Sequence, residues 1–111
     1  MDTLKNIFIE DAISHGNAIL IGENKKANKM HKKLMAYYEM NKKDSAISQL
    51  YLENLTHPNE SVRIWSATFL LKTNPNKAVE TLTELSQSSS IFGLSAKSIL
   101  IMWNNGQLEL L

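Results

Sequence analysis

The residues of this sequence that could do chemistry are few, and their spacing matches no catalytic or metal-binding motif. The three histidines, His15, His31 and His57, lie far apart, with no carboxylate at the spacing of metal ligands. No His-Glu-x-x-His, phosphate-binding, dinucleotide-binding or nucleophile-elbow pattern occurs. Glu10 and Asp11 are neighbouring carboxylic acids, but adjacent residues of a helix do not face each other. We therefore expect no enzyme activity, no metal and no cofactor.

The composition limits the class of protein further. The chain has 111 residues, of which 43% are hydrophobic and 21% are charged, which is typical of one globular domain spanning residues 1–111. The absence of cysteine excludes disulfides and thiolate sites. The N-terminus carries acidic residues where a signal peptide needs an apolar core, and the longest apolar run, Ile99–Trp103, is too short to span a bilayer. We expect a soluble cytoplasmic protein with no membrane partner and no small-molecule substrate.

The apolar residues recur at helical spacing almost throughout, and no stretch of four or more residues alternates as a strand would. This pattern predicts an all-α fold of about six helices. Their expected ranges are about 3–20, 24–40, 45–55, 60–71, 75–85 and 91–103. Asp44, Asn59 and Asn74 are expected to cap the third, fourth and fifth helices. Gly16-Asn17 is expected to interrupt the first.

Candidate core residues follow from the same spacing. The helix over 60–71 is apolar over most of its circumference and is therefore expected at the centre of the fold. Both tryptophans are expected in the core, and the C-terminal leucines are expected to pack back as a lid. The residues expected to face inward include Leu4, Ile7, Phe8, Ala12, Ile19, Ala27, Met30, Leu34, Tyr37 or Tyr38, Ile47, Leu50, Tyr51, Leu55, Trp65, Val79, Leu82, Leu85, Trp103, Leu108, Leu110 and Leu111.

The second half of the chain contains an internal repeat. Residues 65–71 align with residues 94–100, so that serine matches serine and alanine matches alanine. Here the sequence resembles HEAT repeats, whose second helix carries a pattern matched by Asn59, Val62, Arg63, Ala67, Leu70 and Leu71. The resemblance implies a short right-handed α-solenoid of HEAT-like hairpins, with two hairpins over 44–106 and an atypical helical pair over 1–43. In the sixth helix Gly93-Leu94 departs from this pattern, which leaves the number of repeats open.

Residues 44–106 are also similar to a family of small bacterial HEAT-like proteins that end in Trp-x-x-Gly, here Trp103–Gly106. Some proteins of this type are immunity proteins, which inhibit secreted antibacterial toxins, including those of contact-dependent growth inhibition. The resemblance implies an immunity protein that neutralises its cognate toxin by covering the active site or substrate groove. The toxin would be a basic protein, such as an RNase or a DNase.

A lysine stripe on the second predicted helix supports an alternative function. The stripe contains Lys25, Lys29, Lys32 and Lys33, with Lys26 nearby, and aligned lysines can neutralise successive phosphates. A nucleic-acid-binding HEAT module is thus one alternative, and a protein–protein scaffold is another. The charge of residues 1–43 is only +3 (eight lysines against five acids), so an ordinary solvated helix face is favoured over nucleic-acid binding.

Acidic residues provide the candidate partner-binding site. Glu80 and Glu84 stand at i,i+4 on the fifth predicted helix, where like charges repel, and Lys77 offsets only part of this repulsion. A basic partner would neutralise both groups. We predict a partner-binding face formed by Tyr51, Glu53, Glu80 and Glu84.

Overall fold

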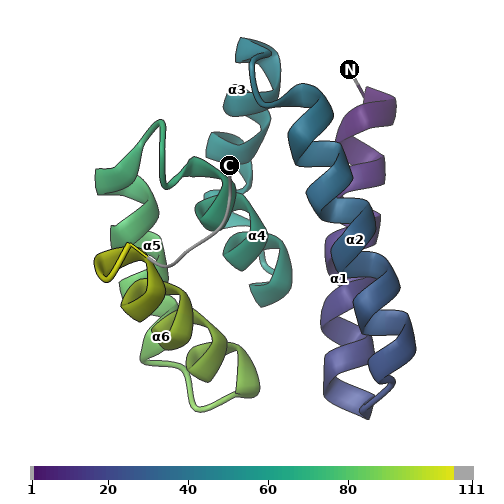
Figure 1. Ribbon diagram of the computed structural model, residues 1–111, viewed down its shortest axis with the longest axis vertical. Helices are drawn as coiled ribbons and strands as arrows, with labels where there is room; N and C mark the ends of the chain where they lie inside the picture. Colours follow the sequence, from purple (N-terminus) through teal and green to yellow (C-terminus); the bar gives the residue numbers. More distant parts are fainter. Residues whose placement is uncertain (1, 107–111) are drawn as a thin grey trace. The chain divides into compact units, whose positions relative to one another are not determined.

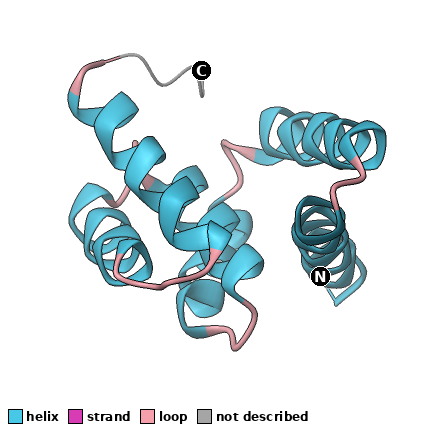
Figure 2. Cartoon of the chain, turned by 90° about the horizontal axis from the view of Figure 1, so that it is seen from below, coloured by secondary structure: helices cyan, strands magenta, loops and turns pink. Residues whose placement is uncertain are grey.

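The computed structural model describes residues 2–106, with side chains from Lys5 onward. This part of the chain contains six α-helices, one short 3-10 helix and no strand, so the all-α prediction is confirmed (Figure 2). The helices are α1 (Asp2–Ile21), α2 (Asn24–Asn41), α3 (Ser45–Glu53), η1 (Asn54–Thr56), α4 (Glu60–Leu70), α5 (Pro75–Ser86) and α6 (Ile91–Asn104). None of the helices within these residues is long and apolar enough to cross a membrane. The predicted lid residues Leu108, Leu110 and Leu111 lie outside the described residues, as does the side chain of Leu4.

The chain forms two compact units, Met1–Leu50 and Tyr51–Leu111. In the first unit α1 and α2 run antiparallel, side by side (Figure 1). The boundary between the units lies inside α3.

The α1–α2 hairpin is held by contacts along its whole length. The rings of Phe8 and Tyr37 stack 5.9 Å apart at one end, and Ala18 and Ala27 are buried near the other end. Small side chains allow two helices to approach closely. The packing of α1 against α2 before and after Gly16 therefore outweighs the free-energy cost of a glycine inside a helix, which is about 1 kcal/mol. The predicted interruption of α1 at Gly16-Asn17 is wrong, because the helix continues to Ile21.

The inward face of α1 is confirmed only in part. Phe8 and Ala12 are fully buried, whereas Ile7 is exposed and Ile19 is half-buried. Ile7 is one residue from Phe8, which is about 100° around the helix, so both side chains cannot point the same way.

Side-chain caps begin α3 and α4 as predicted. An Asp44 carboxylate oxygen accepts a hydrogen bond from the Ala46 N–H at 2.9 Å, and the Asn59 side-chain oxygen accepts one from the Val62 N–H at 3.2 Å. The third predicted helix ends earlier than expected, and Leu55 belongs to η1 and is half-buried. Helix α4 is buried along nearly its whole length, which confirms its central place in the second unit.

The last two helices differ from the sequence prediction in their buried faces. Helix α5 starts at Pro75, but the Asn74 side chain makes no capping bond, and Ala78 is fully buried where Val79 was expected. Helix α6 buries only Gly93 and Ala96. Trp65 is in the core as predicted, while Trp103 is half-buried, because α6 packs on its neighbours with a face of small residues.

Two serine-to-alanine changes are expected to have opposite effects on stability. Ser66 is fully buried, and its hydroxyl has no hydrogen-bond partner among the described residues. Ser66→Ala should leave the free energy of unfolding unchanged or raise it by up to about 1 kcal/mol.

The Ser90 hydroxyl caps α6 by accepting the Phe92 N–H and also donates to the Glu60 carboxylate at 3.2 Å.

Ser90→Ala should therefore lower the free energy of unfolding by about 1–2 kcal/mol. Urea denaturation of both variants measures the difference directly. Equal destabilisation by the two changes would contradict this assignment of the two hydroxyl groups.

Candidate partner-binding surface

Tyr51, one of the four residues proposed to bind a partner, lies in the core. It is 2% exposed, and its ring centroid is 5.3 Å from that of Phe69. Helical spacing puts Tyr51 on the same side of α3 as Ile47 and Leu50, which are also buried. Tyr51 thus offers no surface to a partner, and the prediction is corrected for this residue.

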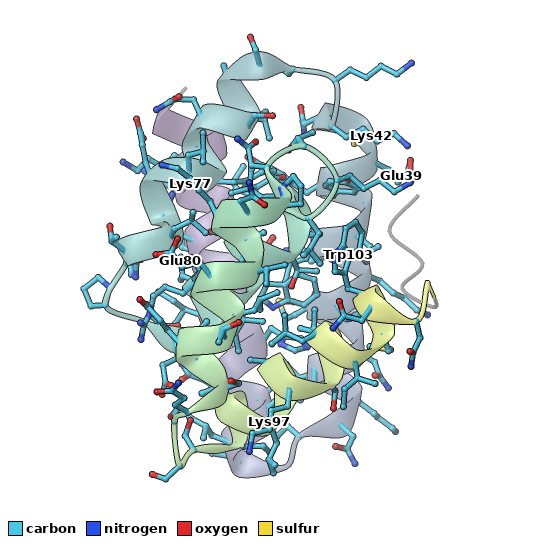
Figure 3. All side chains as sticks on the ribbon, turned by 90° about the vertical axis from the view of Figure 1, so that its left-hand side faces the viewer. Glu39, Lys42, Lys77, Glu80, Lys97 and Trp103 are labelled. Atoms are coloured by element: carbon cyan, nitrogen blue, oxygen red, sulfur yellow. The ribbon has the colours of Figure 1, made fainter. Side chains whose placement is uncertain are left out.

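The three glutamates of the predicted face are exposed. Glu53 ends α3. Glu80 and Glu84 lie on the side of α5 opposite its buried stripe of Ala78, Leu82 and Leu85; Figure 3 shows Glu80. Whether all three glutamates form one face stays a prediction.

The carboxylates of Glu80 and Glu84 have no ion-pair partner anywhere in residues 2–106. Lys77 projects from the preceding turn but forms no ion pair with Glu80 (Figure 3). The like-charge repulsion at i,i+4, about 0.2–0.5 kcal/mol, is therefore not relieved by a direct ion pair within the described chain.

Helix α6, which packs against α5, exposes aliphatic side chains. Leu94 and Ile101 are 64% and 60% exposed, and they stand seven residues apart on one side of the helix. Lys97 lies between them and is also exposed (Figure 3). The second unit thus exposes both acidic groups without an ion pair among the described residues and aliphatic side chains.

The lysines of α2 belong to the first unit. Lys25, Lys29 and Lys32 are exposed on the side opposite the buried residues of α2 and make no ion pair among the described residues. Lys33 is tied to the buried Asp11 carboxylate, with Nζ to Oδ1 at 3.3 Å. Lys26, in the first turn, is also unpaired, and cations there are disfavoured by the helix dipole by about 0.3–1 kcal/mol.

Two of the three histidines come together, contrary to the expectation from their separation in sequence. The rings of His15 on α1 and His31 on α2 have centroids 6.2 Å apart, because the antiparallel hairpin brings these positions side by side. Asp11 lies one turn before His15, but its carboxylate faces Lys33. No group of three metal-binding side chains occurs in the part of the chain that the structure describes. His57 has a structural role, because its Nδ1 accepts the Asn59 N–H at 3.0 Å before α4 begins.

Burial shifts the pKa values of three ionisable groups in the first unit. Burial, and secondly the neighbouring His31, lowers the pKa of His15 below its usual value. Burial also raises the pKa of the Tyr37 and Tyr38 hydroxyl groups, so both phenols stay protonated at neutral pH. Glu10 is exposed and Asp11 is buried, because adjacent residues of a helix point about 100° apart.

The lowered pKa of His15 predicts acid sensitivity. Because the folded state binds the proton more weakly than the unfolded state does, the free energy of unfolding should fall as the pH drops from about 7 through 6.5 toward the folded pKa. Below the pKa values of His15 in both the folded and the unfolded state, this contribution to the free energy of unfolding is fully lost. The free energy should then no longer change with pH through this group. His15→Gln should flatten this part of the profile in urea denaturation between about pH 7.5 and pH 5. A profile unchanged in His15→Gln would contradict the assignment.

Comparisons with known proteins establish the fold and the family. The chain is similar to the crystal structure of the protein RPA1889 from Rhodopseudomonas palustris CGA009, with a TM-score of 0.84, 20% sequence identity, and coverage of 97% of this chain and 91% of that chain. At this identity the similarity shows the fold alone. A search of the curated proteins found no match. The family model of DUF2019, a domain of unknown function, matches residues 2–102, and the chain therefore belongs to the DUF2019 family.

Proposed function

We propose that this protein is a non-catalytic binding protein, and specifically an immunity protein that neutralises a cognate antibacterial toxin. The proposal is carried by the exposed Glu80–Glu84 pair, which lacks an ion-pair partner among the described residues. A basic partner would relieve the repulsion between the two carboxylates. The similarity of residues 44–106 to HEAT-like immunity proteins supplies the class of partner.

A HEAT-like arrangement of hairpins is part of the same proposal. Among the residues that carry the resemblance, Asn59 caps α4, Val62, Ala67, Leu70 and Leu71 are fully buried, and Arg63 is half-buried; the cap and the buried residues support the proposal. Stacked hairpins of this kind have large surfaces and bind other macromolecules. In this proposal α3–α4 and α5–α6 are two such hairpins of a right-handed solenoid.

The proposed mechanism is stoichiometric occlusion in the cytoplasm. Acidic groups on the inhibitor accelerate the encounter with a basic nuclease and orient it, since opposite charges steer diffusing proteins. The exposed Leu94 and Ile101 would then be covered in the complex and would slow its dissociation. No residue of the inhibitor needs to react.

Co-expression with a candidate toxin tests the proposal. If a neighbouring gene encodes a large secreted protein, its C-terminal domain should arrest growth of a heterologous host, and this protein should restore growth and form a one-to-one complex with that domain. A toxin domain that stays active and unbound in its presence would contradict the proposal for that pair. DNA or RNA binding by the isolated protein at moderate salt would instead favour the nucleic-acid alternative, and stable self-assembly in sedimentation would favour a scaffold.

Charge reversal on α5 tests the binding surface. Glu80→Lys with Glu84→Lys should slow association with the toxin by about tenfold or more at low salt, and the difference should shrink as salt is added. The matched control is Glu10→Lys with Glu23→Lys, which reverses two exposed acids of the first unit. Equal effects of both pairs in stopped-flow association would show that only net charge matters and would remove α5 from the proposed face.

A further inference from the structure

The turn between α1 and α2 combines exposed aliphatic side chains with unpaired lysines. Leu20 and Ile21, at the end of α1, are 58% and 66% exposed. Gly22 follows with a φ of +76°, which reverses the chain at the lower end of the hairpin in Figure 1. Because more than half of each side chain is exposed, Leu20 and Ile21 contribute little to the packing of the hairpin.

The lysines begin directly after this turn. Lys25, Lys26 and Lys29 occupy the first two turns of α2, are exposed and have no ion-pair partner in the described chain. We call these three lysines together with Leu20 and Ile21 the hairpin tip. Residues 12–38, which surround the tip, carry five lysines against one glutamate, or +4.

The placement of these charges does not serve the stability of α2. Lys25 and Lys26 lie in the first turn, where the helix dipole disfavours cations, and no acidic residue occurs in that turn. Residues that destabilise a helix and make no compensating contact, as here among the described residues, often belong to a functional surface. An anionic partner would neutralise the lysines.

We propose that the hairpin tip binds the surface of a membrane that contains anionic lipids. Leu20 and Ile21 would enter the boundary between headgroups and acyl chains, and Lys25, Lys26 and Lys29 would contact the phosphate groups around them. This is peripheral attachment, which requires no membrane-spanning helix, and it departs from the expectation from the sequence that the protein has no membrane partner. The proposal does not depend on the α5 surface, which belongs to the other unit.

The side chains around the lysines favour a lipid surface over nucleic acid. Binding of single strands usually needs exposed aromatic rings on which bases stack. The aromatic residues of α2, Tyr37 and Tyr38, are buried, and α2 has no arginine. Exposed aliphatic side chains have no role in contacting phosphates, but they do have one in entering a bilayer.

Co-sedimentation of the full chain with lipid vesicles tests the proposal. The protein should bind vesicles of equal parts phosphatidylglycerol and phosphatidylcholine, should not bind pure phosphatidylcholine, and should be released by high salt. Lys25→Gln with Lys29→Gln should weaken binding roughly fivefold for each lysine. Leu20→Ser with Ile21→Ser should weaken it roughly tenfold or more at the same net charge.

Matched controls come from the second unit. Leu94→Ser with Ile101→Ser removes two aliphatic side chains of similar exposure, and Lys72→Gln with Lys97→Gln removes two exposed lysines. Both controls should retain vesicle binding within about twofold. All the changed side chains are exposed, and circular dichroism should show an unchanged fold.

Three results would overturn the proposal. One is the absence of binding to the anionic vesicles. Another is equal loss of binding in the tip variants and the control variants. The third is binding of a single-stranded RNA that depends on Lys25 and Lys29 but not on Leu20 and Ile21, which would assign the tip to nucleic acid.

Discussion

Gly93→Ala is expected to lower the free energy of unfolding by about 2–3 kcal/mol, although alanine is the better helix former. Gly93 lies in α6, where the helix passes the turn that connects it to α5. A Cβ atom at this position would overlap the carbonyl oxygen of Ser88 and would lie 3.3 Å from the carbonyl oxygen of Leu85. Both are backbone atoms and cannot move aside as a side chain would.

Relief of this overlap would require the turn to shift. The Ser88 N–H donates to the Leu85 carbonyl at 2.9 Å, the Ser88 and Ser90 hydroxyls are 2.9 Å apart, and Ser90 also bonds to Glu60. Moving the turn away from α6 would lengthen these bonds and loosen the start of the helix. The cost of the substitution is therefore shared by the turn, the cap of α6 and the link to α4.

Ser98→Ala is the matched control for Gly93→Ala. Ser98 is an exposed residue of the same helix, so alanine there should raise the free energy of unfolding slightly, by up to about 0.5 kcal/mol. Urea denaturation of the two variants should thus give changes of opposite sign. If Gly93→Ala were as stable as the wild type, the close approach of α6 to the turn would not be present in solution.

Gly93 also shows what sequence reasoning can and cannot find. The helices were predictable because apolar spacing, Asp44, Asn59 and Pro75 all indicate the same boundaries, to within one or two residues for most ends. Gly93-Leu94 was visible only as a departure from the repeat. Its reason, the contact with the backbone of Ser88, depends on the path of a turn, which no local pattern specifies.

The candidate site was predictable only where local helix geometry decides the outcome. The exposure of Glu80 and Glu84 follows from the buried stripe of α5, which helical spacing indicates. The same spacing put Tyr51 with Ile47 and Leu50, so its burial could have excluded it from the partner-binding face. In contrast, the approach of His15 to His31 depends on the register of two helices, which is a tertiary property.

Exposure itself was the least predictable property. Leu20, Ile21, Leu94 and Ile101 are apolar and stand at helical positions that fit a core, yet all four are largely exposed. A sequence shows which residues would gain from burial, but the neighbours that bury them are set by the packing of whole helices. The apolar part of the hairpin tip could therefore be recognised only from the structure.

Phe69→Ala is expected to have the largest effect on stability of any single change considered, about 3–5 kcal/mol. Phe69 is buried in α4, and its ring contacts two others, with centroids 5.3 Å from Tyr51 and 5.4 Å from Trp65. Both pairs are tilted by 51°, an arrangement favourable to aromatic rings. Truncation would leave a cavity between the end of α3 and the C-terminal half of α4, because the neighbouring rings of Tyr51 and Trp65 are too large to move into it.

Two further variants separate the volume of the ring from its aromatic contacts. Phe69→Leu keeps most of the volume and should cost about 1 kcal/mol, with a change in the near-ultraviolet circular dichroism of Trp65. Phe92→Ala removes a half-buried phenylalanine of α6 and should cost less than Phe69→Ala. Equal costs for Phe69→Ala and Phe92→Ala would mean that the three rings do not form the centre of this unit.

The same variants distinguish a core role of Tyr51 from a role in binding. Tyr51 lies two residues before Glu53, so the Tyr51–Phe69 contact helps to fix the end of α3 that carries this carboxylate. If Tyr51 acts only through packing, Phe69→Leu should weaken binding of a partner only in proportion to the unfolded fraction. A loss of affinity in fully folded Phe69→Leu would instead show that the position of Glu53 matters to the complex, which would extend the proposed face from α5 to α3.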